Sequence, residues 1–321
     1  MVESTGGAVP KKEPTAEEMA REIKSLAVSG EFLKAEKMRE HLLQRHPMAL
    51  SEIVASAEII DNEKGAQMDQ GHIEIWNDLY SSLSQEEQNC LFYATRPAVV
   101  TEGKLLFAQG KPNKRLFFID SGRITLYHKK GEERHFIGQL SVGDILGEDA
   151  LLDITFATFA AGCQTDVKLR YLVDLSMEGW DKECPGLKEK LIDYCLKKGR
   201  TSTLLKKQGF DKRMYSRHPA EGRVIAHIIN NQKERTNKGF KGFLQDFSRN
   251  GMSFDIRLSK RATAQALLGR LLELEIDGLN PPVYLVGRIV RLGFHLHGDY
   301  SVHVKLDRVL PENVLQAIIA S

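Results

Sequence analysis

This sequence has few cysteines, no long apolar runs and little net charge. Its 321 residues include 4 Cys, which are Cys90, Cys163, Cys184 and Cys195. They form no CxxC pair and none lies at zinc-ligand spacing from a His, which argues against a disulfide framework and a structural metal. We also expect no bound cofactor. No run of about 18 apolar residues occurs, and the N-terminal segment lacks the apolar core of a signal peptide. We therefore expect a cytoplasmic protein without a membrane segment.

The charge is nearly balanced over the whole chain but not along it. The formal net charge is +2, with 45 Lys+Arg and 43 Asp+Glu, and this value argues against a general nucleic-acid binder. Residues 197–251, however, contain 14 Lys and Arg against 4 Asp and Glu, a local charge of +10. Such a stretch attracts a small phosphate-bearing ligand.

The N-terminal region, residues 1–93, is predicted to be a polar tail followed by helices. Thr15 and Glu18 have the spacing of a capping box, and Ser84 and Glu87 repeat it. Residues 32–46 place apolar side chains on one helical face and resemble one helix of a tetratricopeptide-type hairpin. Because no second copy follows, we expect these helices to pack on a neighbouring domain or on a second chain.

The remaining chain alternates between strand-rich and helical patterns. Short β runs bounded by turn residues predict a barrel or roll, and they are residues 105–107, 115–119, 123–127, 136–137 and 167–172. Residues 187–208 predict one connecting helix that ends at Gly209. A third segment is again strand-rich, at residues 223–229, 251–256, 283–292 and 300–306, with a closing helix at 311–320. The fold class is therefore multidomain α+β.

The middle segment, residues 94–209, resembles the cyclic-nucleotide-binding domain together with its connecting helix. The resemblance rests on three stretches, Gly110–Tyr127, Val142–Leu152 and Thr165–Leu169. In that family a Gly-Glu pair begins the phosphate cassette and a later arginine binds the cyclic phosphate. Gly147 and Glu148 match the pair, but Ala157 takes the arginine's place, and a buried phosphate without a cation is costly. We expect a degenerate domain that acts as a scaffold or dimerisation unit, in which Glu148 caps a short helix.

Two short motifs mark the C-terminal segment, residues 210–321. Arg213 and Arg217 form an RxxxR pair, and Asp246-Phe-Ser248-Arg-Asn-Gly251 is a DxSxxG motif. Each motif alone is weak. In this order, and followed by Gly287–Arg291 and Val302–Leu306, they resemble a PilZ domain. The resemblance implies a six-stranded barrel that binds cyclic di-GMP.

The chemistry of the motif residues suits such a ligand. Arg213 and Arg217 offer guanidinium forks for phosphate oxygens or a guanine edge, while Asp246 and Ser248 offer acceptors for guanine N–H donors. We expect Gly251 to give the turn a conformation closed to other residues and to let the base approach the backbone. Predicted auxiliary residues are Lys212, Arg249 and Asn250.

These features predict a second-messenger receptor. Arg213 and Arg217 lie between the connecting helix and the barrel, so ligand capture would change the angle between the domains and relay the signal to a protein partner. The 187–208 helix could pair with its copy in a homodimer or pack on its own roll. The main alternative is a dual receptor for cyclic AMP and cyclic di-GMP of the transcriptional-regulator type, but no helix-turn-helix follows residue 205, so we expect no direct DNA binding.

An enzyme is the other class considered. The sequence has no nucleophile elbow, Walker motif or dinucleotide fingerprint. His295 and His297 alternate as on an exposed hairpin, without a carboxylate or Cys partner nearby. We therefore expect no enzymatic activity.

Overall fold

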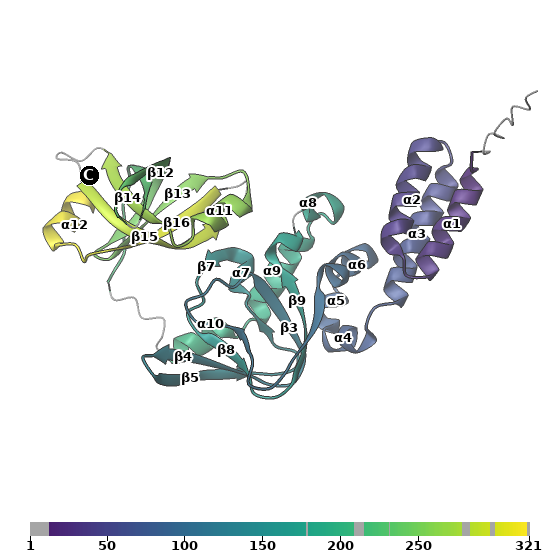
Figure 1. Ribbon diagram of the computed structural model, residues 1–321, viewed down its shortest axis with the longest axis horizontal. Coiled ribbons are helices and arrows are strands. Elements are labelled where there is room, and N and C mark those ends of the chain that lie inside the picture. The colour runs from purple at the N-terminus through teal and green to yellow at the C-terminus, as the bar shows by residue number, and fades with distance from the viewer. Residues whose placement is uncertain are drawn as a thin grey trace, which may run out of the picture. The chain divides into compact units, whose positions relative to one another are not determined.

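The computed structural model divides into two compact units, and Figure 1 labels its helices and strands. It describes residues 13–177, 179–208, 215–230, 232–277, 283–295 and 299–319. One unit comprises Met1–Ala94 with Lys182–Leu187, and the other comprises Thr95–Asp181 with Lys188–Ser321. No helix in these described ranges is long and apolar enough to cross a membrane.

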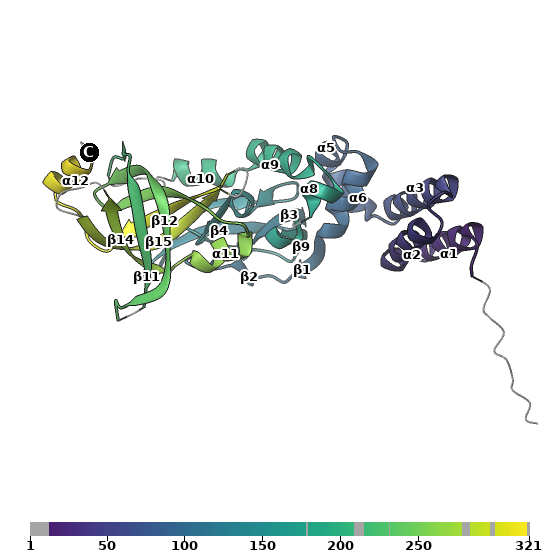
Figure 2. The ribbon, with the colours of Figure 1, turned by 90° about the horizontal axis from the view of Figure 1, so that it is seen from above.

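The first unit is helical. Its helices are α1 (Ala16–Val28), α2 (Phe32–Arg45), α3 (Leu50–Ala66), α4 (Gln70–Ile75), α5 (Asn77–Tyr80) and α6 (Gln85–Ala94). The later helix α8 (Trp180–Glu183) crosses the boundary between the units, which falls between Asp181 and Lys182. Both expected capping boxes are present, at Thr15–Glu18 and Ser84–Glu87. Figure 2 shows α1, α2 and α3 side by side.

The core of α1–α3 corrects one expectation. Ile23, Ala35 and Leu42 are completely buried, and Ile60 of α3 belongs to the same apolar cluster. The third helix therefore supplies the partner face that we expected from another domain or chain. The apolar residues of α3 are not all on its buried face, since Leu50 is exposed while Ile60 is buried. The helical periodicity of this segment therefore gave no clear signal in the sequence.

The second unit begins with a β-roll of two four-stranded sheets, in the orders β1-β9-β3-β6 and β2-β8-β4-β5. The strands of the first sheet are β1 (Arg96–Val100), β9 (Val167–Val173), β3 (Arg115–Ser121) and β6 (Ile145–Leu146). Those of the second are β2 (Leu105–Phe107), β8 (Ala160–Cys163), β4 (Ile124–Lys130) and β5 (Glu133–Leu140). The sheets enclose Ile119, Ile124 and Leu126, all fully buried. The short helix α7 (Asp149–Leu152) and the strand β7 (Asp153–Thr155) lie between β6 and β8.

The predicted connecting helix is two helices, α9 (Leu187–Lys198) and α10 (Thr201–Lys207), so the expectation of one helix to residue 208 is wrong. The break falls at Gly199, where a Cβ would lie 2.7 Å from the carbonyl oxygen of Cys195 and 2.8 Å from Oε1 of Glu148. Arg200 then binds Asp144 of the roll at 3.1 Å. Leu204 and Leu205 pack against the roll core. Helix α10 therefore packs on its own roll.

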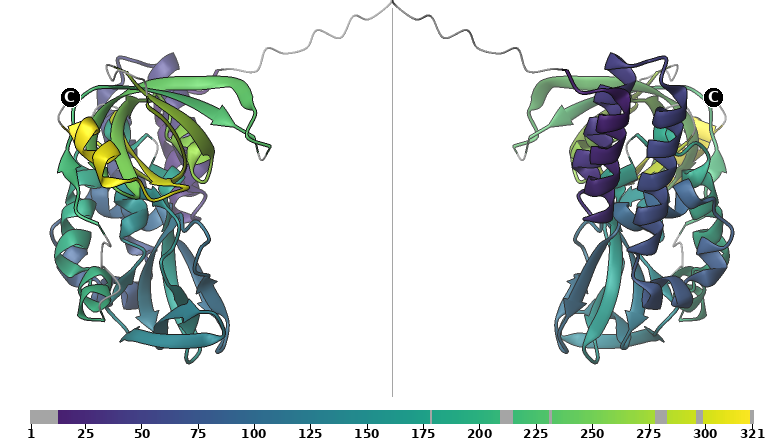
Figure 3. Two further views of the ribbon diagram at one scale, coloured as in Figure 1. Left: turned by 90° about the vertical axis from the view of Figure 1, so that its left-hand side faces the viewer. Right: turned by 90° about the vertical axis from the view of Figure 1, so that its right-hand side faces the viewer.

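The second unit ends in a barrel of six longer strands joined by the short strand β10 (His218–Pro219). The longer strands are β11 (Arg223–Ile229), β12 (Arg235–Ser248), β13 (Gly251–Arg257), β14 (Leu271–Asp277), β15 (Val283–Phe294) and β16 (Asp299–Leu306), and the helices are α11 (Arg261–Leu267) and α12 (Glu312–Ile319). The order β12-β11-β14-β15-β16-β13 closes because β13 also pairs with β12. Figure 3 shows the barrel from one end, with the long green hairpin of β11 and β12 extending from it.

Inward-facing apolar side chains fill the barrel. Val224, Phe247 and Val302 come from three different strands and are fully buried, and Ile318 of α12 joins their cluster. Along β11 and β16, buried side chains alternate with more exposed ones, as expected. Strands β12 and β14 and helix α11 were not predicted. The first half of β12 is rich in Lys, Gly and Asn and largely exposed, so it lacks the alternation that identifies a strand.

The break at Gly199 predicts an effect on stability. We expect Gly199→Ala to lower the free energy of unfolding by about 1–3 kcal/mol, because the added methyl group overpacks the contact with Glu148 and the Cys195 carbonyl. Urea denaturation measures the change. Gly162→Ala is the matched control, since its Cβ would meet nothing closer than 3.4 Å. Equal stability of the two variants would contradict the steric role of Gly199.

Candidate ligand-binding site

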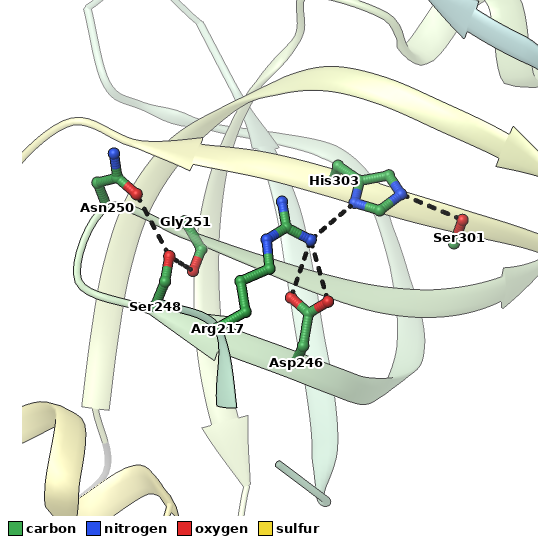
Figure 4. A network of polar contacts seen from close by, with 7 residues as sticks. All are labelled: Arg217, Asp246, Ser248, Asn250, Gly251, Ser301 and His303. Carbon is green, nitrogen blue, oxygen red and sulfur yellow. Dashed lines mark hydrogen bonds and ion pairs between the residues drawn. The ribbon is translucent and has the colours of Figure 1, made fainter. Parts of the chain in front are cut away.

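The barrel brings Arg217 and Asp246 together. Residues His218 and Pro219 pair with Phe247 and Asp246 across the β10–β12 ladder, so Arg217, directly before β10, lies beside this end of β12. Its Nη1 lies 3.2 Å from Oδ1 and 3.0 Å from Oδ2 of Asp246 (Figure 4). The two side chains are 31% and 28% exposed. The site is therefore half-buried and open to a ligand.

His303 and Ser301 of β16 extend this site, and sequence reasoning missed both. Nδ1 of His303 lies 3.4 Å from Nη1 of Arg217, and Nε2 lies 3.3 Å from Oγ of Ser301. An arginine only donates hydrogen bonds, so Nδ1 is the acceptor and Nε2–H of the neutral ring donates to Ser301. Residues two apart on a strand share a face, which is the signal that could have linked Ser301 to His303. Their nearness to Arg217 depends on strand order.

The second motif forms the tight turn between β12 and β13. Oγ of Ser248 lies 3.0 Å from the carbonyl oxygen of Gly251 and 3.3 Å from Oδ1 of Asn250, and the single hydroxyl proton is shared between them. Ser248 is 3% exposed. In this state its hydroxyl therefore closes the turn, whereas the Asp246 carboxylate contacts Arg217.

Gly251 is required for a different reason from the one predicted. Its φ angle is not in the left-handed region, unlike the eleven glycines that adopt positive φ in the described chain. Instead, a Cβ at Gly251 would lie 2.9 Å from the carbonyl oxygen of Val304. The glycine thus allows β16 to approach the turn closely, and the expected special turn conformation is absent.

The predicted auxiliary residues have mixed placements. Lys212 and Arg213 lie in residues 209–214, outside the described chain. Arg249 donates from Nε to the carbonyl oxygen of Leu310 at 2.9 Å, and its guanidinium lies 5.4 Å from the ring centre of Tyr215. The backbone oxygen of Asn250 accepts from Leu306 at 2.9 Å. In this state Arg249 supports the segment leading to α12, and its role in ligand binding stays a prediction.

The segment of the roll that begins at Gly147 and Glu148, here called the cassette segment, also differs from what we expected. Glu148 is 9% exposed, and its Oε2 accepts a hydrogen bond from the Thr201 hydroxyl of α10 at 3.2 Å. Its side chain makes no capping hydrogen bond to α7, so the predicted cap is wrong. Burial raises the pKa of the Glu148 carboxyl. Gly147 adopts a φ of 87° beside the Arg115 carbonyl, as a glycine can.

Little space remains beside this segment. Ala157 forms backbone hydrogen bonds in both directions, from its nitrogen to Lys111 at 2.9 Å and from the Gly110 nitrogen to its oxygen at 2.8 Å. The neighbouring cavity, lined by Gly147, Phe156 and Ala157 among others, has a volume of about 50 Å³. Small-molecule pockets typically measure roughly 300–1,000 Å³. The cavity in this conformation is smaller than that range.

Within the described residues, no group of three or more His, Cys, Asp or Glu side chains could hold a metal ion. His295 is described and His297 lies in residues 296–298, outside the described chain.

Comparison with known families agrees with the two folds. Residues 98–173 match the cyclic nucleotide-binding domain family, and residues 211–321 match the PilZ domain family. These matches place the chain in the class of cyclic-nucleotide second-messenger receptors. More specifically, it combines a cyclic nucleotide-binding domain with a C-terminal PilZ domain.

Several solved structures are similar to part of the chain. A cyclic nucleotide-binding-like protein from Brucella abortus is 27% identical, with 33% of this chain and 94% of that chain covered and a TM-score of 0.31. A cyclic nucleotide-binding domain from Methylobacillus flagellatus is 18% identical, with 47% and 80% covered and a TM-score of 0.37. The sensor domain of the transcriptional regulator DNR from Pseudomonas aeruginosa is 16% identical, with 46% and 97% covered and a TM-score of 0.34. No match was found among curated proteins.

The buried Glu148 predicts a pH-dependent effect on stability. Because burial raises the pKa of this carboxyl in the folded chain, ionisation favours unfolding, and stability is lost as the pH rises through the folded-state pKa. Glu148→Gln keeps an oxygen acceptor for Thr201 and removes this cost. We expect the variant to unfold at higher urea concentration than the wild type at pH 7.5, with the difference shrinking towards about pH 4 as the wild-type carboxyl becomes protonated.

The control for this measurement is Glu132→Gln, which changes the same charge at an exposed position in the turn between β4 and β5. It should leave the pH profile of the unfolding midpoint unchanged. A Glu148→Gln variant that is less stable than the wild type at pH 7.5 would show that the carboxylate is needed in its ionised form.

Proposed function

We propose that this protein is a cytoplasmic, non-enzymatic receptor for cyclic di-GMP, which binds the dinucleotide at Arg217, Asp246 and His303 of the barrel. One observation carries the proposal. In the described residues, the three polar contacts of the Arg217 side chain all use Nη1. The edge formed by Nε and Nη2 is thus left for a ligand, and this edge binds a phosphate or the O6/N7 edge of guanine through two parallel hydrogen bonds.

Asp246 supports the same ligand. In the free site its carboxylate neutralises Arg217, so the guanidinium is held in place without a bound anion. When a phosphate takes over part of this charge, the carboxylate becomes available to the N1–H and N2–H donors of guanine. Arg217 then pairs with the phosphate and Asp246 with the guanine, so no charge is left unpaired. The basic stretch of residues 197–251 also favours the approach of a dianion.

The cyclic nucleotide-binding domain acts in this proposal as a scaffold and dimerisation unit. Ala157 supplies no cation, and the adjoining cavity of about 50 Å³ is well below the roughly 300–1,000 Å³ of typical small-molecule pockets. These features weigh against the dual receptor and support a single messenger. Arg217 also lies just before β10, where the chain from α10 reaches the barrel, so ligand capture there changes the connection between the two domains and relays the signal to a partner protein.

Titration calorimetry of the full chain with cyclic di-GMP tests the site. We expect Arg217→Ala to weaken binding by about 30-fold or more, because the ligand charge loses its bidentate partner. Arg217→Lys keeps the charge without the fork and should also bind weakly. Arg223→Ala removes an exposed cation from the same basic stretch and should bind within about threefold of the wild type.

Two results would contradict this assignment. Wild-type affinity in Arg217→Ala would exclude the site, and equal losses in Arg217→Ala and Arg223→Ala would reduce it to general charge attraction. Cyclic AMP in a parallel titration should give no heat of binding. Sedimentation velocity with and without cyclic di-GMP tests the proposed homodimer.

A further inference from the structure

A short strand of the cyclic nucleotide-binding domain belongs to the barrel. Strand β7 pairs with neither sheet of the roll in the described residues, and instead adds to β15 in the eight-stranded sheet. The antiparallel register places Asp153, Ile154 and Thr155 opposite Gly293, Leu292 and Arg291. Because β7 directly follows α7 of the cassette segment, the chain that would border a nucleotide phosphate is used to hold the barrel.

Side chains reinforce this pairing. Ile154 is 6% exposed and belongs to the apolar core of the barrel. Oδ2 of Asp153 lies 2.8 Å from Nη2 of Arg291, and the Asp153 side chain is 13% exposed. The hydroxyl of Thr155 donates to the carbonyl oxygen of Val290 at 3.3 Å. An apolar contact, an ion pair and a backbone ladder therefore act on three consecutive residues.

The same segment lines the cavity beside Ala157 in the roll. Thr155 and Phe156 line that cavity together with Ala157, and a Cβ at Gly269 of the barrel would lie 3.0 Å from the Phe156 ring. The segment cannot leave the barrel without also changing the walls of the cavity. The pairing of β7 with β15 and the present shape of the cavity are thus linked.

A chain of contacts joins this docking strand to the ligand site. His303 and Ser301 of β16 lie opposite Arg291 and Gly293 of β15. A Cβ at Gly293 would lie 2.6 Å from Oγ of Ser301 and 3.4 Å from Oδ1 of Asp153. Ser301 therefore lies close to the point where β7 pairs with β15. Its hydroxyl oxygen is hydrogen-bonded to Nε2 of His303, which belongs to the proposed ligand site.

We propose that β7 is a docking strand whose pairing with β15 is controlled by ligand binding at Arg217. This inference rests on the proposed function. Ligand binding at the free Nε–Nη2 edge shifts the Arg217 guanidinium and with it the Nη1 contact to His303, so that His303 and Ser301 rearrange beside Gly293 and Asp153 and the β7–β15 pairing weakens. The two sites are then coupled reciprocally, since whatever frees β7 must also tighten ligand binding.

Hydrogen–deuterium exchange of the full chain, read on peptides covering residues 149–157, tests the coupling. Saturating cyclic di-GMP should increase the exchange rate of the β7 amides about fivefold or more, the lower end of typical coupling between sites. Arg291→Ala and Ile154→Ala should each raise this rate without ligand and tighten cyclic di-GMP binding in calorimetry. Ile154→Ala leaves all charges in place and serves as the second, independent variant.

Arg257→Ala is the matched control, because it breaks an ion pair with Asp299 at 3.0 Å whose Arg257 side chain is 78% exposed. It should change neither β7 exchange nor affinity. Ligand binding with unchanged or slower β7 exchange would overturn the inference and leave the proposed function intact. Absence of cyclic di-GMP binding in the wild type would overturn the proposed function and the coupling together.

Discussion

Arg217 faces Asp246 because a pairing of only two residues, between β10 and β12, places the start of the barrel beside one end of its longest strand. This contact defines the free state of the site. The carboxylate holds the guanidinium near the surface by charge-assisted hydrogen bonds, and the half-exposed geometry limits what these bonds contribute to stability. An ion pair of this kind is well suited to exchange, because a ligand anion can replace one partner at little cost.

Much of the fold follows from local patterns, whereas the contacts at the site do not. Alternating apolar residues identified strands such as β11 and β16, and the two motifs include Arg217 and Asp246, which the barrel places side by side. His303 escaped notice because it approaches Arg217 only through the order β12-β13-β16. Sequence spacing cannot specify which strands become neighbours when the connections differ in length. The orientation of Glu148 was missed for the same reason, since it depends on where α10 returns to the roll.

Glycine positions show how backbone approach organises both domains. The missing side chain of Gly251 leaves room for the Val304 carbonyl oxygen. The missing side chain of Gly199 leaves room for the Cys195 carbonyl oxygen and the Glu148 carboxylate. Neither residue needs a positive φ angle. The usual inference from glycine to a left-handed turn therefore fails at these positions, where the missing side chain serves close packing between elements that are distant in sequence.

Ala157 stands where the cyclic nucleotide-binding family has an arginine. The pairing of β7 with β15 gives a physical reason for this difference. A segment that holds a phosphate must present its backbone and a cation to the ligand, whereas a segment that adds to a sheet must present its backbone to a neighbouring strand. Asp153–Thr155 does the second, and with Asp153 it brings a negative charge that Arg291 neutralises. An anionic ligand beside this carboxylate would meet repulsion in a poorly solvated place. The absence of a cation at Ala157 and the pairing of β7 with β15 therefore favour the same state, in which a strand of the roll adds to the barrel sheet and the proposed ligand site lies in the barrel.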